Sequence, residues 1–294
     1  MQPNEINFKQ ERDFGDLFNA TFAFIGAEIK RLGTAILYFA VPLMLVGAIL
    51  SVFISVEQQQ SLQSLQSGAM DMENPFAIYG KIYNGYFFLN LLVPLIIYGL
   101  LSCITLGYVK LYVNKGKDNF TLSEVWSEVT KYIVPVIFAS LLTAIITAIG
   151  AVFCLVPGVY LGVSLSLFVP LIVIEGKGFG DAFNRSFKLV KHKFWMTLGA
   201  LFVMGIIVYV ISMILSIPAL ILGMKPFFAS IMEGKDVNFD FGISFYIISA
   251  IISLLTYIVY SIPTILVAFL YYSLVETYEK PSLVDRIDQI SDNE

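Results

Sequence analysis

The stretch "FGDAFNRSFKLVKHKFW" at residues 179–195 repeats a phrase that the chain has already used. A shorter version, "FGDLFNATF", stands at residues 14–22, and six of its nine positions are identical in the two copies. The shared positions include a Gly-Asp pair and an asparagine, which an apolar surface does not by itself require. Each copy precedes an apolar run. The repetition therefore predicts that one building block is used more than once.

Plotted at helical spacing, the longer copy separates into two faces. Its apolar face holds Phe179, Ala182, Phe183, Ser186, Phe187, Val190 and Phe194, and its polar face holds Asp181, Asn184, Arg185, Lys188, Lys191 and His192. An acid near the start and bases near the end suit the helix dipole. This pattern predicts an amphipathic helix that lies in a membrane interface, with phenylalanines in the acyl boundary and cations at the headgroups.

The composition requires an apolar environment. Hydrophobic residues make up 57% of the chain, charged residues 14%, and the mean hydropathy is +0.80. Soluble domains are typically about 45–50% apolar and about 25% charged. We therefore expect an integral membrane protein. The polar first 30 residues do not predict a signal peptide, and Cys103 and Cys154, both within apolar runs, are expected to be ordinary packing residues.

Six apolar stretches are long enough to cross a bilayer, for which a helix needs about 20 residues. They are Gly33–Val56, Phe87–Val109, Ile133–Leu155, Gly158–Ile174, Trp195–Leu222 and Ile243–Val275. Every stretch contains one proline, at Pro42, Pro94, Pro135, Pro170, Pro218 and Pro263. Proline removes a backbone donor and tends to kink a helix, so kinked spans are expected.

A third, weaker copy of the amphipathic lead, "TLSEVWSEVTKYI", stands at residues 121–133. Thr121 and Glu124 have the spacing of a capping box, which starts a helix. The sequence thus predicts an all-α integral membrane protein with six transmembrane helices, arranged as three parallel repeats of interfacial amphipathic helix plus helical hairpin. The repeat units are 14–113, 120–175 and 179–276 of a single membrane domain, 1–294, with a tail at 277–294. The general tendency of cytoplasmic segments to be amphipathic and basic explains the third copy equally well.

Orientation follows from the cations, because lysine and arginine accumulate in cytoplasmic loops. Of the eighteen, only Lys81, Lys225 and Lys235 fall on one side of the predicted spans. The other fifteen fall on the side that holds both ends of the chain. We therefore expect both termini to be cytoplasmic.

The segment "EGKGFGDAFNRSFKLVKHKFW" at residues 175–195, followed by a long span, resembles the membrane domain associated with bacterial glycerophosphodiester phosphodiesterases and related six-span membrane proteins. The resemblance implies a location in the bacterial cytoplasmic (inner) membrane. In that family the domain often stands alone or precedes a soluble phosphodiesterase barrel, and residues 1–294 are expected to contain no such barrel. Some relatives occur near MoxR-type ATPase systems, which implies a membrane or ATPase-system protein as a partner.

Residues for catalysis are scarce. None of the six stretches contains Asp, Glu, Lys, Arg or His, and the single histidine, His192, stands between two lysines. Intramembrane charge is the usual indicator of a functional site in a membrane protein, and a metal site needs several ligands. The sequence therefore predicts no catalytic, cofactor or metal site, no enzymatic activity and no nucleic-acid partner.

The remaining candidate site is a basic cluster, Arg185, Lys188, Lys191 and Lys193, which is expected to contact anionic lipid headgroups. On this basis the sequence predicts a non-enzymatic accessory or scaffold component of a membrane assembly, with membrane lipids and proteins as partners.

A transporter or lipid-handling protein is the alternative, with a cavity between kinked hairpins. That cavity would be lined by Asn90, Ser102, Thr105, Thr143, Thr147, Ser164, Ser166, Ser253 and Thr256. An inward cavity lined by these residues favours the transporter, and tight closure favours the scaffold.

Overall fold

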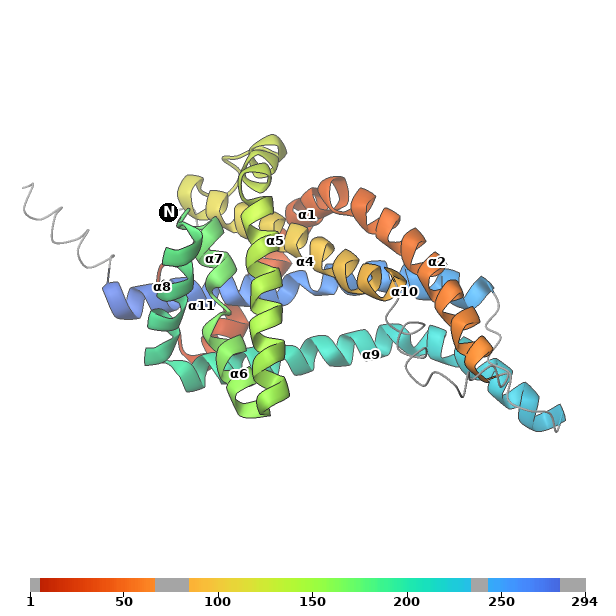
Figure 1. Cartoon of the computed structure of the whole chain (residues 1–294). Helices are drawn as coiled ribbons and strands as arrows, with labels where there is room; N and C mark the ends of the chain where they lie inside the picture. Colours follow the sequence, from red (N-terminus) through yellow and green to blue (C-terminus); the bar gives the residue numbers. More distant parts are fainter. Residues whose placement is uncertain (1–5, 67–84, 234–242, 281–294) are drawn as a thin grey trace, which may run out of the picture. The chain divides into compact units, whose positions relative to one another are not determined.

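The computed structural model describes residues 6–66, 85–233 and 243–280, and within these ranges the chain is helical and contains no strand (Figure 1). The helices are α1 (Phe14–Phe39), α2 (Val41–Gln66), α4 (Gly85–Lys115), α5 (Leu122–Phe153), α6 (Leu155–Ser164), α7 (Phe168–Val173), α8 (Phe179–His192), α9 (Phe194–Glu233), α10 (Ile243–Val259) and α11 (Ser261–Glu279). The predicted all-helical class is confirmed.

Five helical stretches are long and apolar enough to cross a membrane. A sixth is obtained if α1 and α2, which meet at a bend of 57°, are counted as one broken span. The protein is therefore a membrane protein with several helices able to span, and the number agrees with the six predicted stretches. The arrangement of these spans as three parallel repeats remains a prediction.

Prolines have two different effects on the spans. Pro42, Pro170 and Pro263 each lie in the first turn of a helix, directly after a break in the predicted span. The first-turn amides have no partner within the helix, so the missing N–H of proline does no harm there. The other three prolines lie inside the continuous helices α4, α5 and α9. The predicted first, fourth and sixth spans are thus divided, into α1 and α2, α6 and α7, and α10 and α11.

The repeated phrase begins a helix at the same residue in both copies, Phe14 in α1 and Phe179 in α8. The two copies also bury corresponding positions: Leu17, Thr21 and Phe24 in α1, and Ala182, Ser186 and Leu189 in α8. Beyond the phrase the two helices differ, because α1 runs on into the apolar stretch while α8 ends at His192 and a single residue separates it from α9. In α5, too, the predicted lead and the predicted span form one continuous helix, started by the Thr121–Glu124 capping box.

The chain forms two compact units. Among the described residues, the first comprises 6–39, 99–208 and 260–280, and the second comprises 40–66, 85–98, 209–233 and 243–259. In the first unit α5 packs on α6 and α7, α7 packs on α8, and α1 packs on α11. The hairpin of α5 and α6 is tight, because a Cβ atom added to Gly158 would lie 2.7 Å from the backbone nitrogen of Ala151. In the second unit α2 packs on α10, and Tyr98 of α4 meets Tyr257 of α10 edge to face.

Candidate functional site

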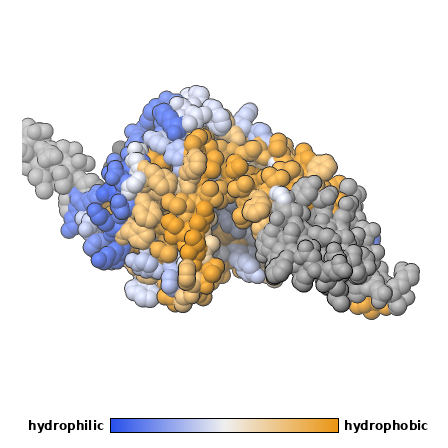
Figure 2. Space-filling model, in the orientation of Figure 1, coloured by the Kyte–Doolittle hydropathy of each residue, from blue (hydrophilic) through white to orange (hydrophobic). Residues whose placement is uncertain are grey.

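The amphipathic helix α8 packs its inner face against α6, α7 and α11. Ala182, Ser186, Leu189 and Val190 are its buried residues. The hydroxyl of Ser186 donates a hydrogen bond of 2.6 Å to the backbone carbonyl of Ser164, the last residue of α6. Hydrophilic residues gather where α8 and the end of α11 lie, whereas hydrophobic residues cover α5 (Figure 2). The predicted division of α8 into two faces is thus present, with much of the apolar face turned toward protein.

Arg185 fixes the outer face of α8 to its neighbours. Its two terminal nitrogens donate to the two carboxylate oxygens of Glu279 in α11, at 2.6 and 3.0 Å. Its Nε donates to Glu175, which also accepts a hydrogen bond of 2.8 Å from the hydroxyl of Tyr271. The hydrogen bonds to Glu279, partly opposed by burial, raise the pKa of Arg185 above its ordinary value. Paired hydrogen bonds of this kind give strong and geometrically specific contacts.

Lys193 fixes the end of α8. Its Nζ donates to the carboxylate of Glu11 at 2.7 Å and to the hydroxyl of Thr277 at 3.2 Å. The hydrogen bond from Lys193 lowers the pKa of the Glu11 carboxyl. Arg185 and Lys193 thus hold α8 against α11 and against the segment that precedes α1.

Lys188 and Lys191 are exposed on the outer face of α8, and neither forms an ion pair or a side-chain hydrogen bond with the residues that the structure describes. The four predicted headgroup contacts therefore separate into two cations that bind protein carboxylates and two that face outward. The neighbouring His192 lies against Tyr278, with ring centroids 4.3 Å apart. Across the described part of the chain, no group of three or more His, Cys, Asp and Glu side chains is placed to hold a metal ion.

Sequence reasoning missed Glu28, a carboxylate only 1% exposed on the inner face of α1. The hydroxyl of Tyr108 in α4 donates to its Oε2 at 2.6 Å, and the Nζ of Lys117 lies 3.3 Å from its Oε1. The hydrogen bond with Glu28 raises the pKa of Lys117. Its burial could have been predicted, because Glu28 continues the helical spacing of the buried Leu17, Thr21 and Phe24.

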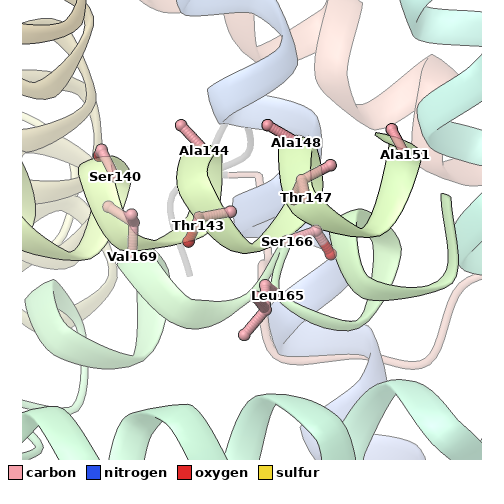
Figure 3. A pocket seen from close by; sticks show the side chains of 9 residues that line it. All are labelled: Ser140, Thr143, Ala144, Thr147, Ala148, Ala151, Leu165, Ser166 and Val169. Carbon is pink, nitrogen blue, oxygen red and sulfur yellow. The ribbon is translucent and has the colours of Figure 1, made fainter. Parts of the chain in front are cut away.

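A groove of about 580 Å³ runs along α5 where it faces the break between α6 and α7 (Figure 3). It is lined by Ser140, Thr143, Ala144, Thr147, Ala148, Ala151, Leu165, Ser166 and Val169. Small side chains leave this space open. The hydroxyl oxygens of Thr143, Thr147 and Ser166 are covered by neighbouring atoms and form no hydrogen bond within the described residues.

Three of the nine residues predicted to line a transport cavity, Thr143, Thr147 and Ser166, line this groove. In the first unit, Thr105 is fully buried and Ser102 is half-buried, and neither lines the groove. In the second unit, the hydroxyls of Ser253 and Thr256 donate to carbonyls of their own helix, and Asn90 is exposed. Of the two cysteines, Cys103 is buried as expected, while Cys154 is exposed at the turn between α5 and α6.

Comparison with known proteins gives one informative result. A family model described as the membrane domain of glycerophosphoryl diester phosphodiesterase matches residues 128–287, which is more than half of the chain. The matched region begins within α5 and includes α8 and α11, and so contains both cationic pairs of α8. No curated protein and no solved structure matches the chain.

Proposed function

This chain belongs to the family of the membrane domain of glycerophosphoryl diester phosphodiesterase, and from this premise we propose that it is a non-enzymatic accessory or scaffold component of a membrane assembly. In this proposal the chain lies in the bacterial inner membrane with both termini in the cytoplasm. Its face at α8 binds anionic lipid headgroups and presents a fixed surface to a protein partner.

One observation supports this proposal most directly. Arg185 and Lys193 hold α8 in place through ion pairs to Glu279, Glu175 and Glu11, while Lys188 and Lys191 point away from the protein. A helix that is fixed at two points and exposes two cations one turn apart is suited to a headgroup phosphate. Cations near an anionic membrane surface attract such lipids.

The two tryptophans make this testable, because Trp195 lies just after α8 and Trp126 lies on α5. Quenching by brominated anionic and zwitterionic lipids is measured in the reconstituted full chain, with each tryptophan in turn replaced by phenylalanine. We expect Lys188→Gln with Lys191→Gln to lower the anionic preference at Trp195 by about fivefold per lysine at low salt. The signal at Trp126 stays unchanged.

The matched control is Lys9→Gln with Lys30→Gln, which removes the same charge from two exposed lysines outside α8. An equal loss at Trp195 in this control would mean that net charge, rather than the α8 surface, attracts the lipid. An unchanged preference in the Lys188→Gln, Lys191→Gln protein would contradict the proposal.

The absence of enzymatic activity is part of the proposal. Six glutamates in the described ranges form ion pairs with lysine or arginine side chains: Glu11, Glu28, Glu124, Glu128, Glu175 and Glu279. Such pairing leaves these carboxylates poorly suited to general acid–base catalysis, which needs a group matched to its proton transfer. Purified protein is expected to show no glycerophosphodiesterase activity with magnesium, calcium, manganese or zinc. Turnover that persists on purification and disappears in Asp181→Asn would refute this.

The groove on α5 favours a second candidate, a lipid-handling protein. Its volume of about 580 Å³ is within the range of small-molecule pockets, and its walls are apolar apart from hydroxyls. If lipid occupies it, a photoactivatable acyl chain should crosslink near Ala148 in the wild-type protein. Crosslinking should disappear in Ala148→Trp, which fills the groove, and should persist in Phe202→Trp on the exposed face of α9.

A further inference from the structure

The segment before α1 is packed inside the first unit although it is not helical. The side chain of Phe8 is only 2% exposed and is surrounded by four aromatic rings. Those rings are Phe24 of α1 at 5.2 Å, Tyr112 of α4 at 5.9 Å, and Phe269 and Tyr272 of α11 at 4.0 and 5.6 Å between centroids. Phe8 and Phe269 stack with their planes 3° apart. Three helices thus build an aromatic pocket, and the chain's own Phe8 fills it.

The segment keeps its shape through its own hydrogen bonds. The guanidinium of Arg12 donates to the backbone carbonyls of Asn7, Phe8 and Gln10, the last two at 3.0 and 3.4 Å. The backbone nitrogen of Lys9 donates to the side chain of Asn7 at 2.9 Å. The carbonyls of Asn7, Phe8 and Gln10 therefore stay paired when residues 6–13 leave the pocket as a unit, whereas the carbonyl of Arg12 loses the hydrogen bond that it accepts from Ser273.

Few polar contacts join the segment to the helices. The backbone nitrogen of Arg12 donates to the hydroxyl of Ser273 at 3.0 Å, and that of Ile6 donates to the hydroxyl of Tyr112 at 3.1 Å. The Arg12 guanidinium lies 4.8 Å from the ring centroid of Phe269, and Glu11 pairs with Lys193. A cavity of about 200 Å³ between Ile6–Lys9 and the end of α4 borders the segment. The contact is therefore an aromatic side chain in a pocket, with one arginine beside it.

We propose that residues 6–13 are a tethered ligand, and that the aromatic pocket of Phe24, Tyr112, Phe269 and Tyr272 recognises a peptide with a phenylalanine followed four residues later by an arginine. When the segment is seated, it joins α11, α4 and the end of α8. When it leaves, the pocket is open to a peptide of the same kind from another molecule. This binding site is distinct from the outward lysines of α8 and does not depend on lipid binding.

Position 273 can be used to measure how often the segment leaves the pocket, because Ser273 is 1% exposed and contacts Arg12. In the full chain carrying Cys103→Ala, Cys154→Ser and Ser273→Cys, we measure the rate of modification by a small uncharged thiol reagent. Phe8→Ala is expected to raise this rate about tenfold or more, because the segment opens locally. Lys9→Ala, an exposed neighbour in the same segment, leaves the rate unchanged.

A synthetic peptide of residues 6–13 is then added to the Phe8→Ala protein. The peptide is expected to slow modification again, while the same peptide with alanine in place of its phenylalanine has no effect. Three results would overturn the proposal: an unchanged rate in Phe8→Ala, no protection by the peptide, or loss of helical content in Phe8→Ala by circular dichroism. The last result would make Phe8 an integral part of the core. An Arg12→Gln variant gives an independent second route to the same opening.

Discussion

At the scale of single residues, Glu28 is a charged side chain in a position that helical spacing assigns to the core. Its carboxylate is 1% exposed and is stabilised by the Tyr108 hydroxyl and by Lys117. Removing one partner of a buried charged group costs free energy, because the remaining group keeps its desolvation penalty. The contact that Glu28 makes between α1 and α4 therefore stabilises the protein only when both Tyr108 and Lys117 are present.

Tyr108→Phe tests this directly, because it deletes only the hydroxyl that donates to Glu28. We expect the free energy of unfolding in detergent to fall by about 1–3 kcal/mol. Tyr209→Phe in α9 removes a hydroxyl from a tyrosine that is 69% exposed, and should leave stability unchanged. Equal effects of the two substitutions would show that the buried hydrogen bond contributes nothing.

Gly158 is a second residue whose size matters. An added Cβ would lie 2.7 Å from the nitrogen and 2.8 Å from the Cα of Ala151, which are backbone atoms that cannot rotate away. Gly158→Ala should therefore separate α5 from α6 and lower the free energy of unfolding by about 1–3 kcal/mol. In Gly205→Ala on α9 the new methyl group meets no atom within 4 Å, so thermal unfolding of this variant should be unchanged or shifted upward. A stable Gly158→Ala protein would show that the hairpin tolerates a wider spacing.

At the scale of elements, α8 depends on the contact between Arg185 and α11. The guanidinium binds both oxygens of Glu279, whose side chain is 37% exposed. A double-mutant cycle with Arg185→Gln and Glu279→Gln should give a coupling of about 0.5–1 kcal/mol, a value reduced by solvent screening. Lys188→Gln combined with Glu279→Gln should be additive in the same unfolding assay. Additivity in both cycles would remove Arg185 as the residue that fixes α8.

Helix starts were readable from the sequence because their signals are local. The Thr121–Glu124 capping box starts α5 as predicted, and the repeated phrase begins a helix at Phe14 and at Phe179. The effect of each proline could not be predicted from the sequence, because some prolines follow a break between two helices and others lie within a continuous helix. Pro170 follows a break, whereas Pro135 lies within α5. Which outcome occurs depends on the neighbours that satisfy the freed carbonyl, and those neighbours are distant in sequence.

At the scale of the whole molecule, the predicted orientation rests on the distribution of lysine and arginine. It places the turn between α5 and α6 outside and the loop between α4 and α5 inside. The native Cys154 is exposed at the outer turn, and Cys103 is buried. On intact cells an impermeant thiol reagent should therefore label Cys154. In a Cys154→Ser background, Ser123→Cys should be labelled only after the membrane is permeabilised. Labelling of Ser123→Cys on intact cells would reverse the topology.

The candidate site was only partly readable from the sequence. Composition and periodicity identified α8 and its cations, because a charged face is a local property of one helix. Arg185 and Lys193 bind protein carboxylates while Lys188 and Lys191 are exposed, and this division depends on Glu175, Glu279 and Glu11. These carboxylates come from three other segments of the chain, and only the tertiary fold brings them to α8.

The hydrogen bond from Ser186 to the carbonyl of Ser164 has a consequence for biogenesis. The last carbonyls of a helix lack partners within it, and an unpaired carbonyl surrounded by hydrocarbon costs several kcal/mol. The donor for Ser164 is encoded 22 residues further on. Until α8 has folded against α6, this carbonyl has no donor from Ser186, even when α6 and α7 are already in the bilayer. This part of the chain therefore reaches its final hydrogen-bonded state only when α8 packs against α6, after the apolar segment itself has entered the bilayer.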